Sequence, residues 1–110
     1  MREPLGCGTR ALVLIPSGAL MLYMVVENFL RGDPIPVYRR FRDRGRLAPE
    51  GLRYVDSWVT QDLQRCFQIM ECDQRAALDQ WIEKWKDLVD FEVVPVMTSA
   101  EARSVVEPKL

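Results

Sequence analysis

The stretch LRYVDSWVTQDLQRCFQIMEC, residues 52–72, contains two alternating apolar and polar segments joined by a short polar linker. Residues 52–59 and 65–72 are rich in Val, Ile, Tyr, Trp and Phe, which favour strands. Only residues 60–64 separate them, a length typical of hairpin loops. We therefore predict a β-hairpin near the middle of the chain.

The segment before this hairpin predicts one strand and one helix. Residues 21–29 (MLYMVVENF) form a nearly continuous apolar run, which is typical of a strand buried on both faces. Asp33 is a candidate N-cap for a helix, and Gly45 is a candidate stop signal. The apolar side of this helix would carry Val37, Tyr38 and Phe41.

The segment after the hairpin predicts a second helix and a last strand. Asp73 is a candidate N-cap, and apolar residues then recur at helical spacing as far as residue 88. These residues are Ala77, Leu78, Trp81, Ile82, Trp85 and Leu88. Residues 90–97 predict a strand in which Pro95 indicates an edge position or a bulge.

The predicted element order is β, α, β, β, α, β, which favours an α+β, ferredoxin-like fold. In this fold a four-stranded antiparallel sheet carries both helices on one face. We expect this domain to span residues 21–98, followed by a polar tail at 99–110 of short helix or coil. The opposite face of the sheet must be polar, bind a large partner, or pack against another copy of the chain.

Residues 1–20 precede the domain, and we expect them to be a poorly ordered extension. A signal peptide is the alternative, because Arg2 and Arg10 lie before an apolar stretch. Pro16, Ser17 and Gly18 interrupt that stretch, and no small-residue cleavage site follows it. The stretch is also shorter than the roughly 20 apolar residues of a membrane span, so we expect no membrane association.

The composition limits the chemistry that the protein can use. The chain of 110 residues has a formal net charge of -1 and contains no histidine, the usual general base near neutral pH. Its cysteines, Cys7, Cys66 and Cys72, are odd in number and lack metal-ligand spacing. We therefore expect no metal site, no disulfide framework and no cofactor, and a reducing, cytoplasmic location.

The alternation of the two hairpin strands predicts which side chains face away from the helices. We assign Val55, Val59, Phe67 and Ile69 to the helix side. The open face would then carry Tyr54, Asp56, Trp58, Cys66, Gln68 and Met70. A single β-bulge would invert this assignment.

Tyr54, Asp56, Trp58 and Gln68 are the candidate ligand-binding residues, because they combine apolar bulk with a few polar groups. Asp56 is the candidate catalytic acid or base. The alternative is that Tyr54 and Trp58 only pack at a dimer interface and that Asp56 pairs with an arginine or a backbone N–H. Glu27 can join the same site if the strand register places it there.

Five arginines lie in residues 37–46 (VYRRFRDRGR), and they raise the question of nucleic-acid or anion binding. Arg39, Arg42 and Arg46 are the candidate anion-binding residues. The alternative, which we favour, is a solvated helix face in which Asp43 pairs with Arg39 and Arg46. RNA-recognition motifs share this element order, but residues 65–72 lack their glycine-containing basic signature. We therefore do not expect nucleic-acid binding.

The pieces PVYRRFRDRGR, PEGLRYVDSW and CFQIMECDQRAALDQWIEKWKDLVDFEVVPV carry a resemblance to a known family. From Met21 to about Ala102 the chain resembles the small bacterial family catalogued as domain of unknown function 3303. The resemblance implies a dimeric α/β barrel, in which two ferredoxin-like protomers pack their sheets together. It implies no activity and no catalytic residue.

Two function classes lead, and a nucleic-acid-binding ferredoxin-like module that acts through the arginines of residues 37–46 is the third alternative. The first is a homodimer that encloses a pocket for a small ligand at the interface between the sheets. The second is a cofactor-independent enzyme, similar to small dimeric-barrel monooxygenases or isomerases, with Asp56 as the acid/base group. The sequence alone leaves open whether the protein is an enzyme.

Overall fold

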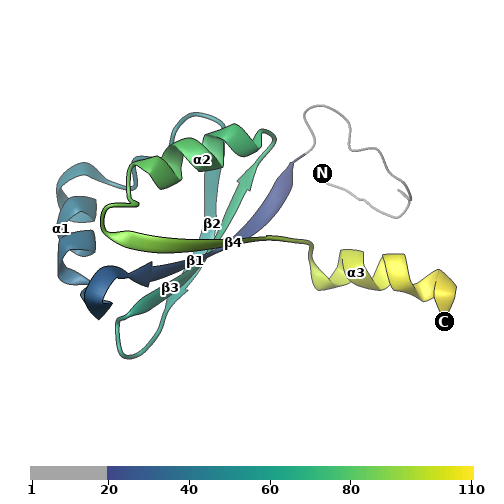
Figure 1. Ribbon diagram of the computed structural model, residues 1–110. Helices are drawn as coiled ribbons and strands as arrows, with labels where there is room; N and C mark the ends of the chain where they lie inside the picture. The colour runs from purple at the N-terminus through teal and green to yellow at the C-terminus, as the bar shows by residue number, and fades with distance from the viewer. Residues whose placement is uncertain (1–19) are drawn as a thin grey trace.

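The computed structural model describes residues 20–110 and contains one antiparallel sheet with three α-helices in that range. The prediction of a poorly ordered extension at 1–20 lies outside the described residues, apart from Leu20. The strands are β1 (Met21–Phe29), β2 (Leu52–Val59), β3 (Arg65–Cys72) and β4 (Val89–Val96). They pair in the order β2-β3-β1-β4, which is the order of a ferredoxin-like sheet (Figure 1).

The predicted βαββαβ order is confirmed. Helix α1 (Ile35–Arg44) connects β1 to β2, and helix α2 (Arg75–Glu83) connects β3 to β4. The hairpin prediction is also confirmed, because β2 and β3 pair antiparallel. Strand β4 lies at the edge of the sheet, where Pro95, which has no N–H, is tolerated.

Local signals set the ends of α1. A short 3₁₀ turn (Leu30–Gly32) leads out of β1, and the N-cap of α1 is Pro34 instead of the predicted Asp33, whose carboxylate accepts the N–H of Ile35 at 3.0 Å. Gly45 ends the helix with φ 74°, and its N–H donates to the carbonyl of Phe41 at 2.8 Å. This left-handed conformation favours glycine, so the predicted stop is confirmed.

Helix α2 is shorter than its apolar spacing predicted. Its N-cap is Gln74 instead of Asp73, and the α-helix ends at Glu83. The chain continues in tighter turns, in which the N–H groups of Lys84 and Trp85 donate to carbonyls three residues earlier. Trp85 therefore stays buried although it lies outside α2.

The core lies between the sheet and the two helices. Strand β1 contributes Tyr23, Val25 and Phe29 to it, and α2 contributes Leu78 and Trp81. The apolar side of α1 is less buried than predicted, because only Val37 is buried, whereas Tyr38 and Phe41 are exposed to 46% and 43%. Helix α1 thus covers the sheet loosely.

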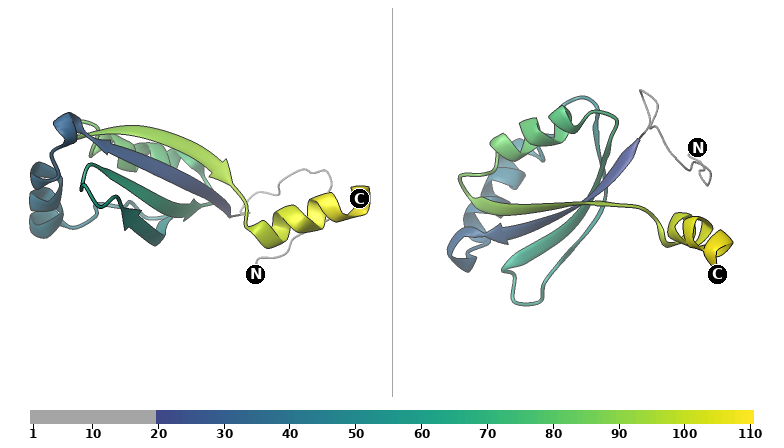
Figure 2. Two further views of the ribbon diagram at one scale, coloured as in Figure 1. Left: turned by 90° about the horizontal axis from the view of Figure 1, so that it is seen from below. Right: turned by 45° about the vertical axis from the view of Figure 1, so that its right-hand side comes forward.

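The tail beyond β4 is helical. Helix α3 (Ser99–Val106) and a 3₁₀ turn (Glu107–Lys109) follow β4 after only two residues. Both views of Figure 2 show α3 projecting beyond the end of the sheet, away from α1 and α2. Within residues 20–110, no helix is long and apolar enough to cross a membrane.

Candidate functional site

A β-bulge divides the predicted ligand residues between the two faces of the sheet. Tyr54 lies opposite Met70, and the register shifts before Asp56, which lies opposite Ile69. Because the bulge inserts one residue, side chains after it point to the other face. Tyr54 therefore faces the helices, whereas Asp56 and Trp58 face away from them, and the prediction that these three share a face is wrong.

The facing predicted for β3 is also wrong, because the whole strand is inverted. Cys66, Gln68 and Met70 are buried on the helix side. Phe67 and Ile69 point to the open face, where they lie opposite Trp58 and Asp56. Gln68, which is 2% exposed, has polar partners on the helix side, Glu27 and Arg46, and the bulk of the side chains alone did not predict them.

Asp56 lies at the surface of the open face. It is exposed, and its carboxylate accepts the N–H of the next residue, Ser57, at 2.8 Å. Trp58 is exposed to 56%. The structure therefore separates Asp56 and Trp58 from Tyr54 and Gln68 and does not form the predicted four-residue site.

A pocket of about 140 Å³ lies on the helix side, between α1 and the sheet. Its lining combines aromatic side chains from the helices with a few polar groups from the strands. The aromatic lining comes from the end of β1, from α1, from α2 and from the turns that follow α2, and the polar groups come from β1, β2, β3 and the loop after α1. The lining residues are Glu27, Phe29, Val37, Tyr38, Phe41, Arg46, Ser57, Val59, Cys66, Gln68, Trp81 and Trp85.

Three polar side chains form a chain of hydrogen bonds along this pocket. Gln68 Nε2 donates to Glu27 Oε2 at 2.8 Å, and Arg46 Nη1 donates to Gln68 Oε1. Both ends of the Gln68 amide are therefore used, which fixes its orientation. Glu27 and Gln68 come from the neighbouring strands β1 and β3, so the register brings them together, as the sequence left open.

The environment of Glu27 changes its acidity. Its side chain is buried, and desolvation raises the pKa of Glu27 from 4.5 to about 7, against the opposing effects of Arg46 and Gln68. Among residues 20–110, its second oxygen, Oε1, accepts no hydrogen bond. A buried carboxyl group that can gain or lose a proton near neutral pH is typical of a binding or catalytic site.

Arg46 is held in place by aromatic rings and by its own backbone. Its guanidinium lies 3.7 Å from the centroid of the Tyr54 ring and 5.3 Å from that of Phe41. Its carbonyl oxygen accepts the indole N–H groups of Trp81 and Trp85 at 3.0 and 2.9 Å. Arg46 therefore belongs to the pocket, a position that its place in the arginine-rich stretch did not predict.

The other polar residues that line the pocket are Cys66, Tyr38 and Ser57. Burial and the charge of Glu27 raise the pKa of the Cys66 thiol to about 12, so this cysteine is unreactive near neutral pH. Burial raises the pKa of Tyr38 above its ordinary value. The hydroxyl groups of Tyr54 and Ser57 are hydrogen-bonded to each other at 2.7 Å.

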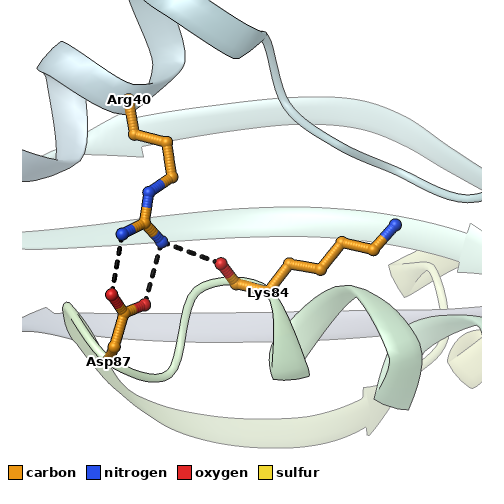
Figure 3. A network of polar contacts seen from close by, with 3 residues as sticks. All are labelled: Arg40, Lys84 and Asp87. Atoms are coloured by element: carbon orange, nitrogen blue, oxygen red, sulfur yellow. Dashed lines mark hydrogen bonds and ion pairs between the residues drawn. The ribbon is translucent and has the colours of Figure 1, made fainter.

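The remaining arginines of α1 have separate positions. Arg40 donates twice to Asp87, at 2.8 and 2.7 Å, and once to the carbonyl of Lys84 at 2.9 Å (Figure 3). Arg42 pairs with its neighbour Asp43, at 2.7 Å, so the predicted pairing of Asp43 with Arg39 and Arg46 is wrong. Arg39 is exposed. The predicted anion-binding residues Arg39, Arg42 and Arg46 therefore do not converge.

The sequence contained one signal for this site. Glu27 is the single charged residue in the apolar run of residues 21–29, and carboxylates are seldom buried without a partner or a function. Trp81 and Trp85 were predicted to be core residues, and they also line the pocket. Within residues 20–110, no group of three acidic or cysteine side chains could hold a metal ion.

Comparison with known proteins gives a family and no function. No curated protein and no solved structure matches the chain significantly. A family model described as "Domain of unknown function (DUF3303)" matches residues 21–110, which include every residue of the pocket. This confirms the resemblance carried by the sequence, and the chain belongs to the DUF3303 family.

Proposed function

We propose that the protein binds a small organic molecule in the pocket between α1 and the sheet. The observation that carries this proposal is the chain Glu27–Gln68–Arg46, which runs along a cavity lined mainly by aromatic rings. Concave sites with apolar walls and a few fixed polar groups are the usual form of small-molecule sites. The pocket lies below the helices instead of at the sheet-to-sheet interface where the sequence pattern placed it.

The size of the pocket favours a ligand with a single ring. A cavity of about 150 Å³ in another protein accepts benzene, and this pocket measures about 140 Å³. The rings of Phe29, Trp81 and Trp85 would pack against the ring of the ligand. Glu27 would then hydrogen-bond a polar substituent such as a hydroxyl, through the oxygen that Gln68 leaves free.

Phenol is a suitable first probe, because it combines one ring with one hydroxyl group. We expect phenol to change the fluorescence of Trp81 and Trp85, and to bind more tightly than benzene. The variant Glu27→Leu should bind benzene at least as well as the wild type and lose its preference for phenol. Asp56→Leu is the matched control, because Asp56 lies on the other face. Equal loss in both variants, or no binding of either probe, would contradict the proposal.

A second candidate function, proton-transfer catalysis without a cofactor, is favoured by the pKa of Glu27 of about 7. A group with a pKa near the working pH can both remove and return a proton. In this reaction class Glu27 takes the acid/base role that the sequence assigned to Asp56.

Native mass spectrometry of gently purified protein would identify a retained molecule. Incubation of that molecule with protein in D₂O should incorporate deuterium, and Glu27→Gln should stop incorporation without preventing binding.

We also propose that two copies of the chain pair through the open face of the sheet. This face consists of the side chains that point away from α1 and α2, and its centre is apolar. Strand register places Leu22, Met24, Val26, Trp58, Phe67, Ile69, Val94 and Val96 there. An apolar surface of this extent is typical of an interface.

The free, buried thiols of Cys66 and Cys72 support the proposal of a reducing, cytoplasmic location.

Sedimentation equilibrium tests the dimer. Val94, which is 40% exposed at the centre of the edge strand, can accept a glutamate without disturbing the core of one protomer. Val94→Glu should convert a dimer into a monomer, because two carboxylates would be buried at the interface without partners. Glu92→Val, on the same face of β4, is the opposite charge change and should leave the dimer intact. A wild-type monomer at all concentrations would contradict this proposal.

A further inference from the structure

Helix α3 makes few contacts with the domain that precedes it. It extends beyond the end of β4, and no other strand or α-helix lies beside it in any view (Figures 1 and 2). The radius of gyration is 16.0 Å. A compact domain of this length has a radius of about 13 Å, so the chain is more extended than a single packed unit.

The start of α3 is nevertheless well defined. Thr98 and Glu101 form a capping box, in which the Thr98 hydroxyl accepts the N–H of Glu101 at 3.0 Å and the Glu101 carboxylate accepts the N–H of Thr98 at 2.9 Å. A cap alone does not hold an isolated helix of eight residues, because helices shorter than about 12 residues need packing to persist in water.

One side of α3 is suited to such packing. At 100° per residue, Ala102, Val105 and Val106 fall within about a quarter of the circumference. Ala100, Ser104 and Glu107 lie on the opposite side. Val105 and Val106 are 48% and 49% exposed, although they are the largest apolar residues of the helix. The apolar side of α3 therefore has no covering within residues 20–110.

We propose that α3 packs this apolar side against a second copy of the chain, so that the two protomers exchange their C-terminal helices. The inference rests on the proposed pairing of the open faces and adds the segment that secures it. Strand β4 supplies Val94 and Val96 to the open face, and only Met97 and Thr98 separate it from α3. A copy packed on that face would lie next to the start of α3, beside which no strand or other α-helix of its own domain lies (Figures 1 and 2).

The exposure of the connection agrees with this arrangement. Met97 is 57% exposed at the point where the chain leaves the sheet, and Leu110 at the end of the tail is 94% exposed. Both would be covered, together with Val105 and Val106, by a partner that extends past the end of the sheet. An exchange of this kind is reciprocal, so each dimer gains the contact twice.

The test compares two pairs of substitutions in the full-length chain that make the same change in charge. Val105→Asp with Val106→Asp places two carboxylates on the apolar side of α3. Ala100→Asp with Ser104→Asp places them on the polar side. The dimer dissociation constant is measured for each variant and for the wild type by sedimentation equilibrium, and thermal unfolding confirms that each domain is folded.

We expect the first pair to weaken the dimer by roughly 100-fold or more, because apolar contacts are lost at two symmetric places, and the second pair to leave it within about threefold. Equal dissociation constants for both pairs and the wild type would overturn the exchange and leave the dimer itself standing. A wild-type monomer would overturn the dimer and the exchange together. The remaining outcome is that the Val105→Asp, Val106→Asp pair disrupts the dimer and Val94→Glu does not. This result would support the helix contact and overturn pairing through the sheet.

Discussion

At the scale of the residue, Glu27 is the most informative side chain of the protein. It is buried in the strand that the sequence marks as the most apolar, and it meets Gln68 and Arg46 only through the sheet register and the loop after α1. The carboxyl group accepts one hydrogen bond from Gln68, and among residues 20–110 its second oxygen has no donor, so it combines a structural contact with the capacity to bind a ligand.

Glu27 should make the stability of the fold depend on pH. Its pKa is about 7 in the folded protein and near 4.5 when unfolded, so the folded state binds more protons between these values. The free energy of unfolding should therefore fall as pH rises from about 4.5 to 7, by roughly 3 kcal/mol. Urea unfolding of the wild type and of Glu27→Gln measures this. The variant should lack this part of the pH dependence. If the free energy of unfolding falls equally with pH in both proteins, Glu27 is not its cause.

Gln68 should contribute more to stability than an exposed glutamine. Gln68→Leu removes the amide that joins Glu27 to Arg46, and it leaves the buried Glu27 and the partly buried Arg46 without that partner. We expect a loss of about 2 kcal/mol at pH 8, where Glu27 is ionised, and a smaller loss at pH 5. Gln64→Leu, an exposed position in the hairpin loop, is the control and should change stability little at either pH.

At the scale of the element, α1 is held by a polar contact near its middle and by the turn at its C-terminal end. Only Val37 is buried along its length. Arg40 ties the middle of the helix to Asp87 and to the carbonyl of Lys84 (Figure 3), and its guanidinium lies 5.4 Å from the centroid of the Trp85 ring. At the C-terminal end, Gly45 turns the chain so that Arg46 enters the pocket. The arginine-rich stretch therefore positions α1 and one wall of the pocket, a role that no nucleic-acid partner is needed to explain.

The two ion pairs of α1 should differ in their effect on stability. Arg40→Ala breaks a bidentate contact between separate elements, together with a bond to a backbone carbonyl. We expect a loss of about 0.5–1 kcal/mol, because Asp87 is largely exposed and solvent screens the pair. Arg42→Ala breaks a pair between adjacent exposed residues and should cause no measurable change. Chemical denaturation measures the free energy of unfolding of both variants. Equal losses in the two variants would contradict the expected difference.

Gly45 should affect both the fold and the pocket. At φ 74° an alanine is strained, although no atom lies within 4 Å of the place where its Cβ would be. Gly45→Ala should therefore cost about 1–2 kcal/mol through backbone strain alone. It should also weaken the binding of phenol, because Arg46 follows directly. Arg44→Ala is the control, and the strain argument fails if both variants unfold at the same denaturant concentration.

At the scale of the whole molecule, two surfaces of the chain lack a covering among residues 20–110. These are the open face of the sheet and the apolar side of α3, and they adjoin at the end of β4. One helical layer covers one face of a sheet, so a four-stranded sheet with two helices leaves the second face for a partner. A second copy of the chain covers both surfaces at once.

The exchange of α3 predicts that its protection depends on protein concentration. In a dimer, the backbone N–H groups of residues 103–106 should exchange slowly with D₂O, because the helix is packed. On dilution below the dissociation constant they should exchange at nearly the rate of an unfolded chain, while β1 stays protected. Hydrogen exchange followed by mass spectrometry measures both segments together. If the N–H groups of α3 exchange fast with D₂O at every protein concentration, the helices are not swapped between protomers.

The sequence by itself determined the order of the elements, the hairpin and the family, and for β4 it left an edge position and a bulge as alternatives. These features depend on local patterns: alternation, helical spacing, Gly45 and Pro95. The tertiary structure alone decided which side chains share a face. One bulge after Tyr54 puts Tyr54 on the helix side while Asp56 and Trp58 stay on the open face, and β3 turns Cys66, Gln68 and Met70 to the helices in place of Phe67 and Ile69. Because side chains in a strand alternate between faces, a shift of one residue moves a whole set of candidates, and no local pattern fixes that shift. The pocket at Glu27, Gln68 and Arg46 follows from register and long-range hydrogen bonds, which exist only once the strands and α1 are packed together.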